Sequence, residues 1–152
     1  MEKIDVEARV EKARTLFQEG YNCAQAVFLT YSDVFGMDRA LAARLAASFG
    51  GGMGRMREVC GTVSGMAMIA GLIEPADQPG DKDAKARNAA LVREFADTFR
   101  QENGSIICRE LLGLDQKEGD ASVAPRKRPC VEFVATAARI VGEKLTVSTE
   151  NE

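Results

Sequence analysis

The sequence contains no histidine and no tryptophan among its 152 residues. Without histidine, the chain lacks the commonest general base and the commonest nitrogen ligand for metals. Ser-His-Asp and Cys-His catalysis within one chain are therefore excluded. The chemically unusual residues that remain are four cysteines, Cys23, Cys60, Cys108 and Cys130.

Long apolar runs and concentrated positive charge are also lacking. No window reaches the ~18 consecutive apolar residues of a membrane span, and the closest, residues 66–73, is far shorter. The charged stretch at residues 1–17 has no apolar core of the kind that a secretory signal needs. The net charge of −3 argues against broad binding to nucleic acid. We therefore expect a cytoplasmic protein with no membrane or nucleic-acid partner, in which cysteines are usually reduced, catalytic or metal-bound.

The hydrophobic pattern is helical along the chain, and no stretch shows the convincing alternation of a strand. Asn22, Asp38 and Ser105 stand where N-cap side chains would begin helices. The expected helices span about residues 5–19, 22–36, 38–49, 60–72, 81–102, a short segment after Ser105 that holds Cys108, and 130–145. We predict an all-α, single-domain bundle of about six to seven helices.

The segments between these helices are expected to be loops. Residues 74–80 contain two prolines and a glycine, and the polar residues 115–128 predict a mobile loop. The chain from about residue 146 is expected to be a frayed tail. No repeat or linker divides the sequence, so residues 1–152 are taken as one domain.

Each cysteine falls within the first turn of an expected helix. Helix N-termini carry partial positive charge, which stabilises a thiolate. Arg55 and Arg57 precede Cys60, and a basic run at residues 126–128 precedes Cys130. A cysteine on an apolar helix is often core filler, but four at helix starts favour a shared function. Cys60 is expected to be the attacking thiol, because the two arginines and the helix start would lower its pKa.

The spacing of the cysteines restricts that function. There is no Cys-x-x-Cys, so a thioredoxin-like motif and a compact zinc knuckle are both absent. Four dispersed cysteines could still converge, either as two redox pairs or as an all-thiolate metal site. Tetrahedral sulfur ligation would favour zinc or an iron–sulfur cluster over hard cations.

The glycine stretch at residues 49–54 is a weak candidate for a cofactor site. The pattern Gly-x-Gly-x-x-Gly is not completed, because Arg55 or Arg57 occupies its last position, and no Gly-Lys-Ser follows. Glycine loops at helix starts can still bind anions, and the alternative is a tight turn between two helices. The candidate cofactor-binding residues are Gly50, Gly51, Gly52, Gly54 and Arg55.

Several segments together resemble a known family. They are GYNCAQA at 20–26, FGGGMG at 49–54, CGTVSG at 60–65, CRELLG at 108–113, and Cys130. In this order they resemble the C_GCAxxG_C_C family of redox-active proteins, over about residues 13–141. Thr62 stands where the family motif commonly has alanine. The resemblance implies a small helical protein whose four cysteines are its functional residues, supported by the glycine stretch; it names no substrate.

Two classes of function remain open. The first is a redox protein, either an oxidoreductase or an electron-transfer protein, with an unidentified redox partner. It would use either an iron–sulfur cluster ligated by the four cysteines or dithiol/disulfide exchange. The second is a non-catalytic module that binds or senses zinc or another soft metal through the same cysteines. A helical interaction protein with core cysteines is a weaker third alternative, and the small-residue helix at 60–72 would allow a homodimer.

Overall fold

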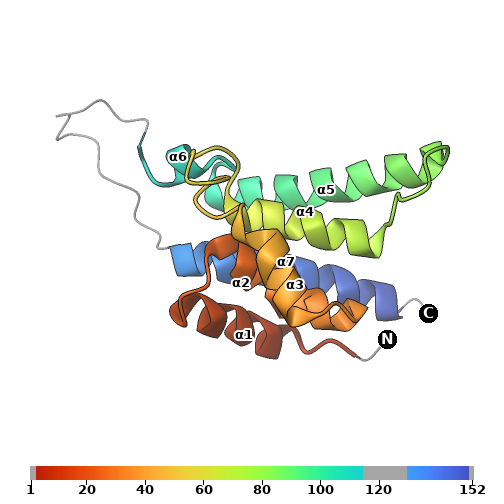
Figure 1. The fold of residues 1–152 in the computed structure, drawn as a ribbon, viewed down its shortest axis with the longest axis horizontal. Coiled ribbons are helices and arrows are strands. Elements are labelled where there is room, and N and C mark those ends of the chain that lie inside the picture. Colours follow the sequence, from red (N-terminus) through yellow and green to blue (C-terminus); the bar gives the residue numbers. More distant parts are fainter. Residues whose placement is uncertain (1–2, 115–129, 151–152) are drawn as a thin grey trace.

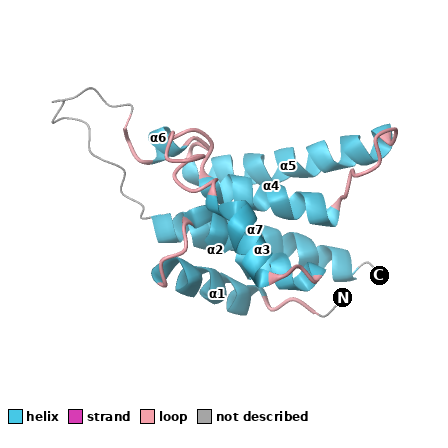
Figure 2. Cartoon of the chain, in the orientation of Figure 1, coloured by secondary structure: helices cyan, strands magenta, loops and turns pink. Residues whose placement is uncertain are grey.

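The computed structural model describes residues 3–114 and 130–150, and this part of the chain consists of seven α-helices, a short 3₁₀ helix and their connections (Figure 1, Figure 2). The elements are α1 (Val6–Gln18), α2 (Cys23–Ser32), η1 (Asp33–Phe35), α3 (Arg39–Ala47), α4 (Gly61–Ile73), α5 (Lys82–Asn103), α6 (Cys108–Leu111) and α7 (Cys130–Glu150). Within the described residues, the extended pairing is one antiparallel bridge between Val59 and Ile107. The all-α prediction is confirmed.

Polar side chains begin four of the helices as N-caps. Asp5, Asn22, Asp38 and Asp81 each accept a hydrogen bond from the backbone N–H three residues later, at 2.9–3.1 Å. At the start of α2 the side chain of Gln25 also accepts from the backbone of Asn22, which completes a capping box. The predicted helix starts at Asn22 and Asp38 are therefore confirmed.

Three expectations about the ends of helices were wrong. Ser105 does not cap the short helix, whose N-cap is Ile107; its hydroxyl accepts from the Ile107 backbone and donates to Glu110. The α2 helix ends at Ser32, and the chain continues as a 3₁₀ turn. Helix α7 continues to Glu150, so the expected frayed tail is helical to that residue. The expected loop at 115–128 lies outside the described residues.

Helix α2 lies at the centre of the bundle. It packs against α1, α3, α4 and α7, and most of its residues are buried. Helix α7 packs along α1 and also contacts α4 and α5, so that it joins the two sides of the molecule (Figure 1). The apolar helix α4 is held between α2 and α5. This packing fixes the N-terminal ends of α2, α4 and α7 relative to one another.

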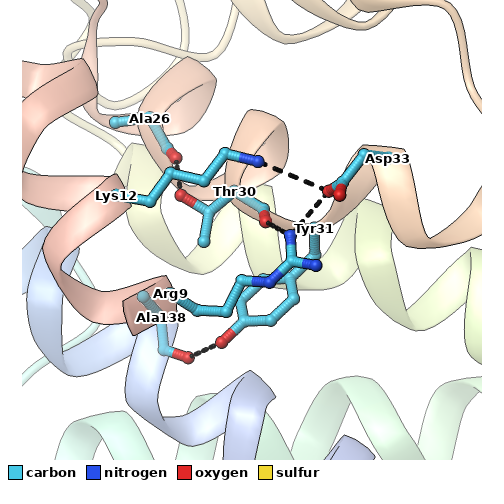
Figure 3. A network of polar contacts seen from close by, with 7 residues as sticks. All are labelled: Arg9, Lys12, Ala26, Thr30, Tyr31, Asp33 and Ala138. Atoms are coloured by element: carbon cyan, nitrogen blue, oxygen red, sulfur yellow. Dashed lines mark hydrogen bonds and ion pairs between the residues drawn. The ribbon is translucent and has the colours of Figure 1, made fainter. Parts of the chain in front are cut away.

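Polar contacts anchor the far end of α2 (Figure 3). The hydroxyl of Tyr31 donates to the backbone oxygen of Ala138 in α7 at 2.6 Å. Arg9 in α1 donates to the Thr30 oxygen and to Asp33 Oδ1, each at 2.7 Å. Burial raises the pKa of Tyr31. These contacts fix the position of α2 and hence of Cys23 at its other end.

Candidate functional site: a four-cysteine pocket

All four cysteines line one pocket of about 190 Å³, called the thiol pocket below. Cys23, Cys108 and Cys130 are the first residues of α2, α6 and α7, and Cys60 is the N-cap of α4. The expectation that each lies at a helix start is confirmed, and the structure brings the four starts together. The other side chains and glycines around the pocket are Phe17, Asn22, Gly51, Arg57, Gly61, Thr62, Leu111, Leu112 and Phe133.

Cys23 lies in close contact with the start of α4. A Cβ atom added at Gly61 would overlap the Sγ atom of Cys23 and would approach the Phe49 oxygen to 2.9 Å. The glycine after Cys60 is therefore required by the close approach of α2 to α4. Burial raises the pKa of the Cys23 thiol, and hydrogen bonds from the backbone of Gly51 and Ala24 oppose that rise.

Cys60 is the most enclosed of the four thiols, with 6% of its surface exposed. Its Sγ atom lies 3.1 Å from the hydroxyl of Thr62, which is itself fully buried. Burial raises the pKa of the Cys60 thiol to about 12, although the hydrogen bonds from Thr62 oppose it. The expectation that Arg55 and Arg57 would lower this pKa was wrong, because desolvation disfavours the thiolate more strongly.

Arg57 instead contacts Cys108. Its Nη1 atom donates to the Cys108 sulfur at 3.8 Å, and so places a positive charge beside that sulfur. Two backbone hydrogen bonds flank the bridge between Val59 and Ile107: the Cys60 N–H donates to Ile106, and the Cys108 N–H donates to Glu58. This short pairing places Cys60 opposite Ile106 and Cys108 opposite Glu58, on either side of the bridge, and both cysteines line the same pocket although they are far apart in the sequence.

The glycine stretch forms a turn with an unusual backbone. Gly51, Gly52 and Gly54 have positive φ, and so do the non-glycine residues Met53, Arg55 and Arg57, with φ of 62–64°. Backbone hydrogen bonds close the turn, from Gly54 to Ser48 at 2.7 Å and from Glu58 to Gly52 at 3.0 Å. The turn therefore has a defined shape although it contains no regular helix.

The candidate cofactor-binding residues separate into two groups. Gly50, Gly51, Gly54 and Arg55 line a second pocket of about 330 Å³, together with Asn22, Ala47 and Arg57. Gly52 lines neither pocket, but an added Cβ would approach the Cβ of Cys108 and the backbone nitrogen of Glu58, each to 2.7 Å. Its lack of a side chain makes room for Cys108, so Gly52 supports the cysteines directly.

Two contributors to the site were missed from the sequence. Thr62 was treated as a minor departure from the family motif, but its hydroxyl contacts the Cys60 sulfur. That departure was itself the signal, because it places a polar group two residues from a cysteine at a helix start. Arg57 was assigned to Cys60, whereas its contact with Cys108 depends on a pairing that no local pattern indicates.

The thiols are spread around the pocket rather than clustered at one point. Within residues 3–114 and 130–150, no three cysteine or carboxylate side chains gather closely enough to hold a single metal ion. No disulfide joins the cysteines in this part of the chain. The pocket walls are largely apolar, with Phe17, Leu111 and Phe133 among them.

The comparisons with known proteins identify a family and no individual relative. A family model described as "Putative redox-active protein (C_GCAxxG_C_C)" matches residues 21–144, which is most of the chain. No curated protein and no solved structure matches. None of the helices in the described ranges has both the length and the apolar character needed to cross a membrane. The chain therefore belongs to the C_GCAxxG_C_C family, and the four cysteines of its motif surround one pocket.

Proposed function

We propose that Cys23, Cys60, Cys108 and Cys130 together ligate one iron–sulfur cluster in the thiol pocket, and that the protein transfers electrons. The single observation that carries this proposal is the convergence of four helix starts, and of every cysteine in the chain, on that pocket. Four cysteine thiolates are the common ligand set of such clusters. When bound, the cluster would supply one-electron redox chemistry.

The spacing of the thiols supports a cluster over a single ion. A zinc ion binds sulfur at about 2.3 Å, so its four thiolates must lie almost in contact with one another. No three ligating side chains in the described residues are arranged in that way, whereas the four cysteines line a pocket of about 190 Å³. A group of several atoms fits this arrangement better than one ion does.

The surroundings of Cys60 also favour a ligand role. With its pKa raised to about 12, this thiol is protonated at neutral pH, which makes it a poor nucleophile. Coordination to a metal deprotonates a thiol outright, so a high pKa does not prevent ligation. The guanidinium of Arg57 beside Cys108 and the backbone N–H of Gly51 at Cys23 would offset part of the negative charge of the thiolates.

The walls of the pocket would control access to the centre. Phe17, Leu111 and Phe133 present apolar surface that excludes water from the sulfur atoms. Cys23 and Cys130 are half-buried, whereas Cys60 and Cys108 are buried. The side of the pocket formed by the starts of α2 and α7 is therefore where an electron donor or acceptor would approach most closely.

The proposal is tested on protein purified without oxygen, by visible absorption with analysis of iron, acid-labile sulfide and zinc. We expect broad absorption between roughly 300 and 600 nm and equal amounts of iron and sulfide. Cys60→Ala and Cys108→Ala should each lose the iron. The control Met66→Leu changes a fully buried residue of α4 outside the pocket lining and should retain it. Iron that persists in all the cysteine variants would refute the proposed ligation.

A second candidate is dithiol/disulfide exchange between Cys23 and Cys60. The Cys23 sulfur packs against Gly61, the residue after Cys60, and negative charge on Cys23 is among the causes that raise the pKa of Cys60. The two thiols would give two electrons and two protons to a disulfide of a partner, which becomes a dithiol as the Cys23–Cys60 bond forms. A colourless, metal-free protein with that reversible disulfide would select this function. Colourless protein with bound zinc would select the soft-metal module.

A further inference from the structure

We propose that the second pocket binds an oxyanion group, a carboxylate or phosphate, through Arg55 and Arg57, and holds the ligand beside the thiol pocket. This second pocket, called the arginine pocket below, has a volume of about 330 Å³. The role of this site rests on the proposed function, because the bound anion would be a molecule that approaches the cysteines. Anion binding itself does not require a cluster.

No carboxylate in the lining of the arginine pocket balances its positive charge. Its lining contains two arginines, an asparagine, an alanine and glycines, and no carboxylate. Among the described residues, no carboxylate lies within ion-pair distance of Arg55 or Arg57. Six of the nine other arginines in the described residues pair with carboxylates, namely Arg9, Arg14, Arg87, Arg100, Arg109 and Arg139, whereas Arg39, Arg44 and Arg93 do not. Two guanidinium groups at one pocket without a carboxylate fit an anionic ligand.

The backbone of the glycine stretch holds both arginines at the pocket. Arg55 and Arg57 have φ of 63° and 62°, a conformation that residues with a side chain rarely adopt. Hydrogen bonds from their backbone N–H groups to Gly50 and Gly51 secure this conformation, at 3.2 and 3.1 Å. Gly50 and Gly51 permit this close packing, because an added Cβ would overlap the Asn22 side chain at Gly50 and would approach the Arg55 Cα to 3.0 Å at Gly51.

The arginine pocket and the thiol pocket share lining residues. Asn22, Gly51 and Arg57 line both. Arg57 also donates to the Cys108 sulfur, so one side chain borders both the anion site and a thiol. A small molecule anchored at Arg55 by its carboxylate or phosphate would therefore lie against residues that also line the thiol pocket.

Thiol reactivity with two disulfide reagents tests this placement on the reduced, metal-free protein. A thiolate displaces one half of either reagent as a thiolate and keeps the other half as a mixed disulfide. The arginine pocket should raise the rate at which the dianionic dithiobis(nitrobenzoate) reacts with the thiols, and it should not raise the rate for the neutral dipyridyl disulfide. We expect Arg55→Gln to lower the ratio of the two rates by roughly tenfold, and Arg55→Lys to keep most of it. A ratio in Arg55→Gln equal to that of the wild type would overturn the proposal.

Arg93→Gln is the matched control for this experiment. Arg93 is exposed on α5 and lines neither pocket, so its loss makes the same change of net charge away from the site. Its rate ratio should stay close to that of the wild type. An equal fall in Arg93→Gln and Arg55→Gln would show that only net charge matters, and would also overturn the proposal.

Protection of the thiols from the anionic disulfide by added anions identifies the source of the oxyanion group. Inorganic phosphate, glycerol phosphate and succinate are each added before the anionic disulfide. Equal protection by the two phosphates would support a free oxyanion as ligand, and stronger protection by glycerol phosphate or succinate would support an organic anion. Absence of protection by all three would contradict anion binding. Iron and sulfide content, measured on Arg55→Gln purified without oxygen, reports separately on the proposed cluster.

Discussion

Two residues beside the cysteines affect the thiols directly: Gly61 allows the close approach of Cys23, and the Thr62 hydroxyl partly opposes the rise that burial causes in the pKa of Cys60. Gly61 leaves room for the Cys23 sulfur at the point where α2 meets α4. Thr62 contributes a hydroxyl to a thiol that is otherwise enclosed. Both act over a few ångströms, so their effects can be isolated by single substitutions.

Gly61→Ala should displace Cys23 and destabilise the protein. The added methyl group overlaps the Cys23 sulfur and approaches the backbone oxygen of Phe49, so we expect the free energy of unfolding to fall by about 1–3 kcal/mol. Gly71→Ala is the matched control in the same helix, because nothing lies within 4 Å of its added Cβ. It should raise stability by about 0.5–1 kcal/mol. Urea unfolding measures the stability of both variants. A free energy of unfolding in Gly61→Ala equal to that of the wild type would show that the close contact does not require a glycine.

The raised pKa of Cys60 predicts a loss of stability in alkali. Burial moves this pKa from 9.0 to about 12, so above pH 9 the unfolded chain loses the proton more readily than the folded chain. The contribution is fully present below the unfolded pKa and is lost as the pH rises towards the folded pKa. Burial also raises the pKa of Cys23, with the same sign.

Reduced, metal-free protein should therefore lose stability between about pH 9 and 10.5, and Cys60→Ser should lose about 1–2 kcal/mol less than the wild type over that range. Urea unfolding with an excess of reductant gives both curves. The raised pKa of Tyr31 acts in both proteins and cancels in the comparison. Parallel curves for the two proteins would contradict the assigned burial of Cys60.

At the scale of the elements, α2 is the helix that places Cys23, and its two ends are fixed differently. The capping box of Asn22 and Gln25 defines its start. The hydrogen bond from Tyr31 to Ala138 fixes its other end to α7, the helix that begins with Cys130. The relative position of two cysteines therefore depends on a contact distant from both.

Tyr31→Phe should lower the free energy of unfolding by about 1 kcal/mol, because it removes a buried hydrogen bond between two helices. Tyr21→Phe makes the same chemical change in a half-buried tyrosine, whose hydroxyl has no hydrogen bond among the described residues. It should change stability by a few tenths of a kcal/mol at most. The two variants are compared by urea unfolding at neutral pH. Equal losses would show that the Tyr31–Ala138 contact contributes nothing specific.

Most helices could be predicted from the sequence because their signals are local. Asn22 and Asp38 each begin a helix through a hydrogen bond to a residue three positions along, a distance that a short pattern covers. Ser105 was misassigned because its hydroxyl accepts from the Ile107 backbone N–H and donates to the Glu110 carboxylate, and so does not cap the helix. Serine favours such local hydrogen bonds both at helix starts and in turns, so its presence alone does not place the start of the helix.

At the scale of the whole molecule, the convergence of the four helix starts could not be derived from local patterns. The pairing of Val59 with Ile107 joins the segments that carry Cys60 and Cys108, and the packing of α7 on α1 and α2 brings in Cys130. These contacts join segments far apart in the chain. The raised pKa of Cys60 follows from the same packing, because the sequence shows the arginines near it but not the burial that outweighs them.

A potentiometric titration of protein purified without oxygen, followed by visible absorption, tests whether the four cysteines hold the proposed electron-transfer centre. We predict a single reversible transition with a one-electron slope, about 59 mV per tenfold change in the ratio of oxidised to reduced protein. The transition should be absent from Cys60→Ala. A colourless protein whose thiols instead titrate with the two-electron slope of about 30 mV would contradict the cluster and assign the redox function to a disulfide.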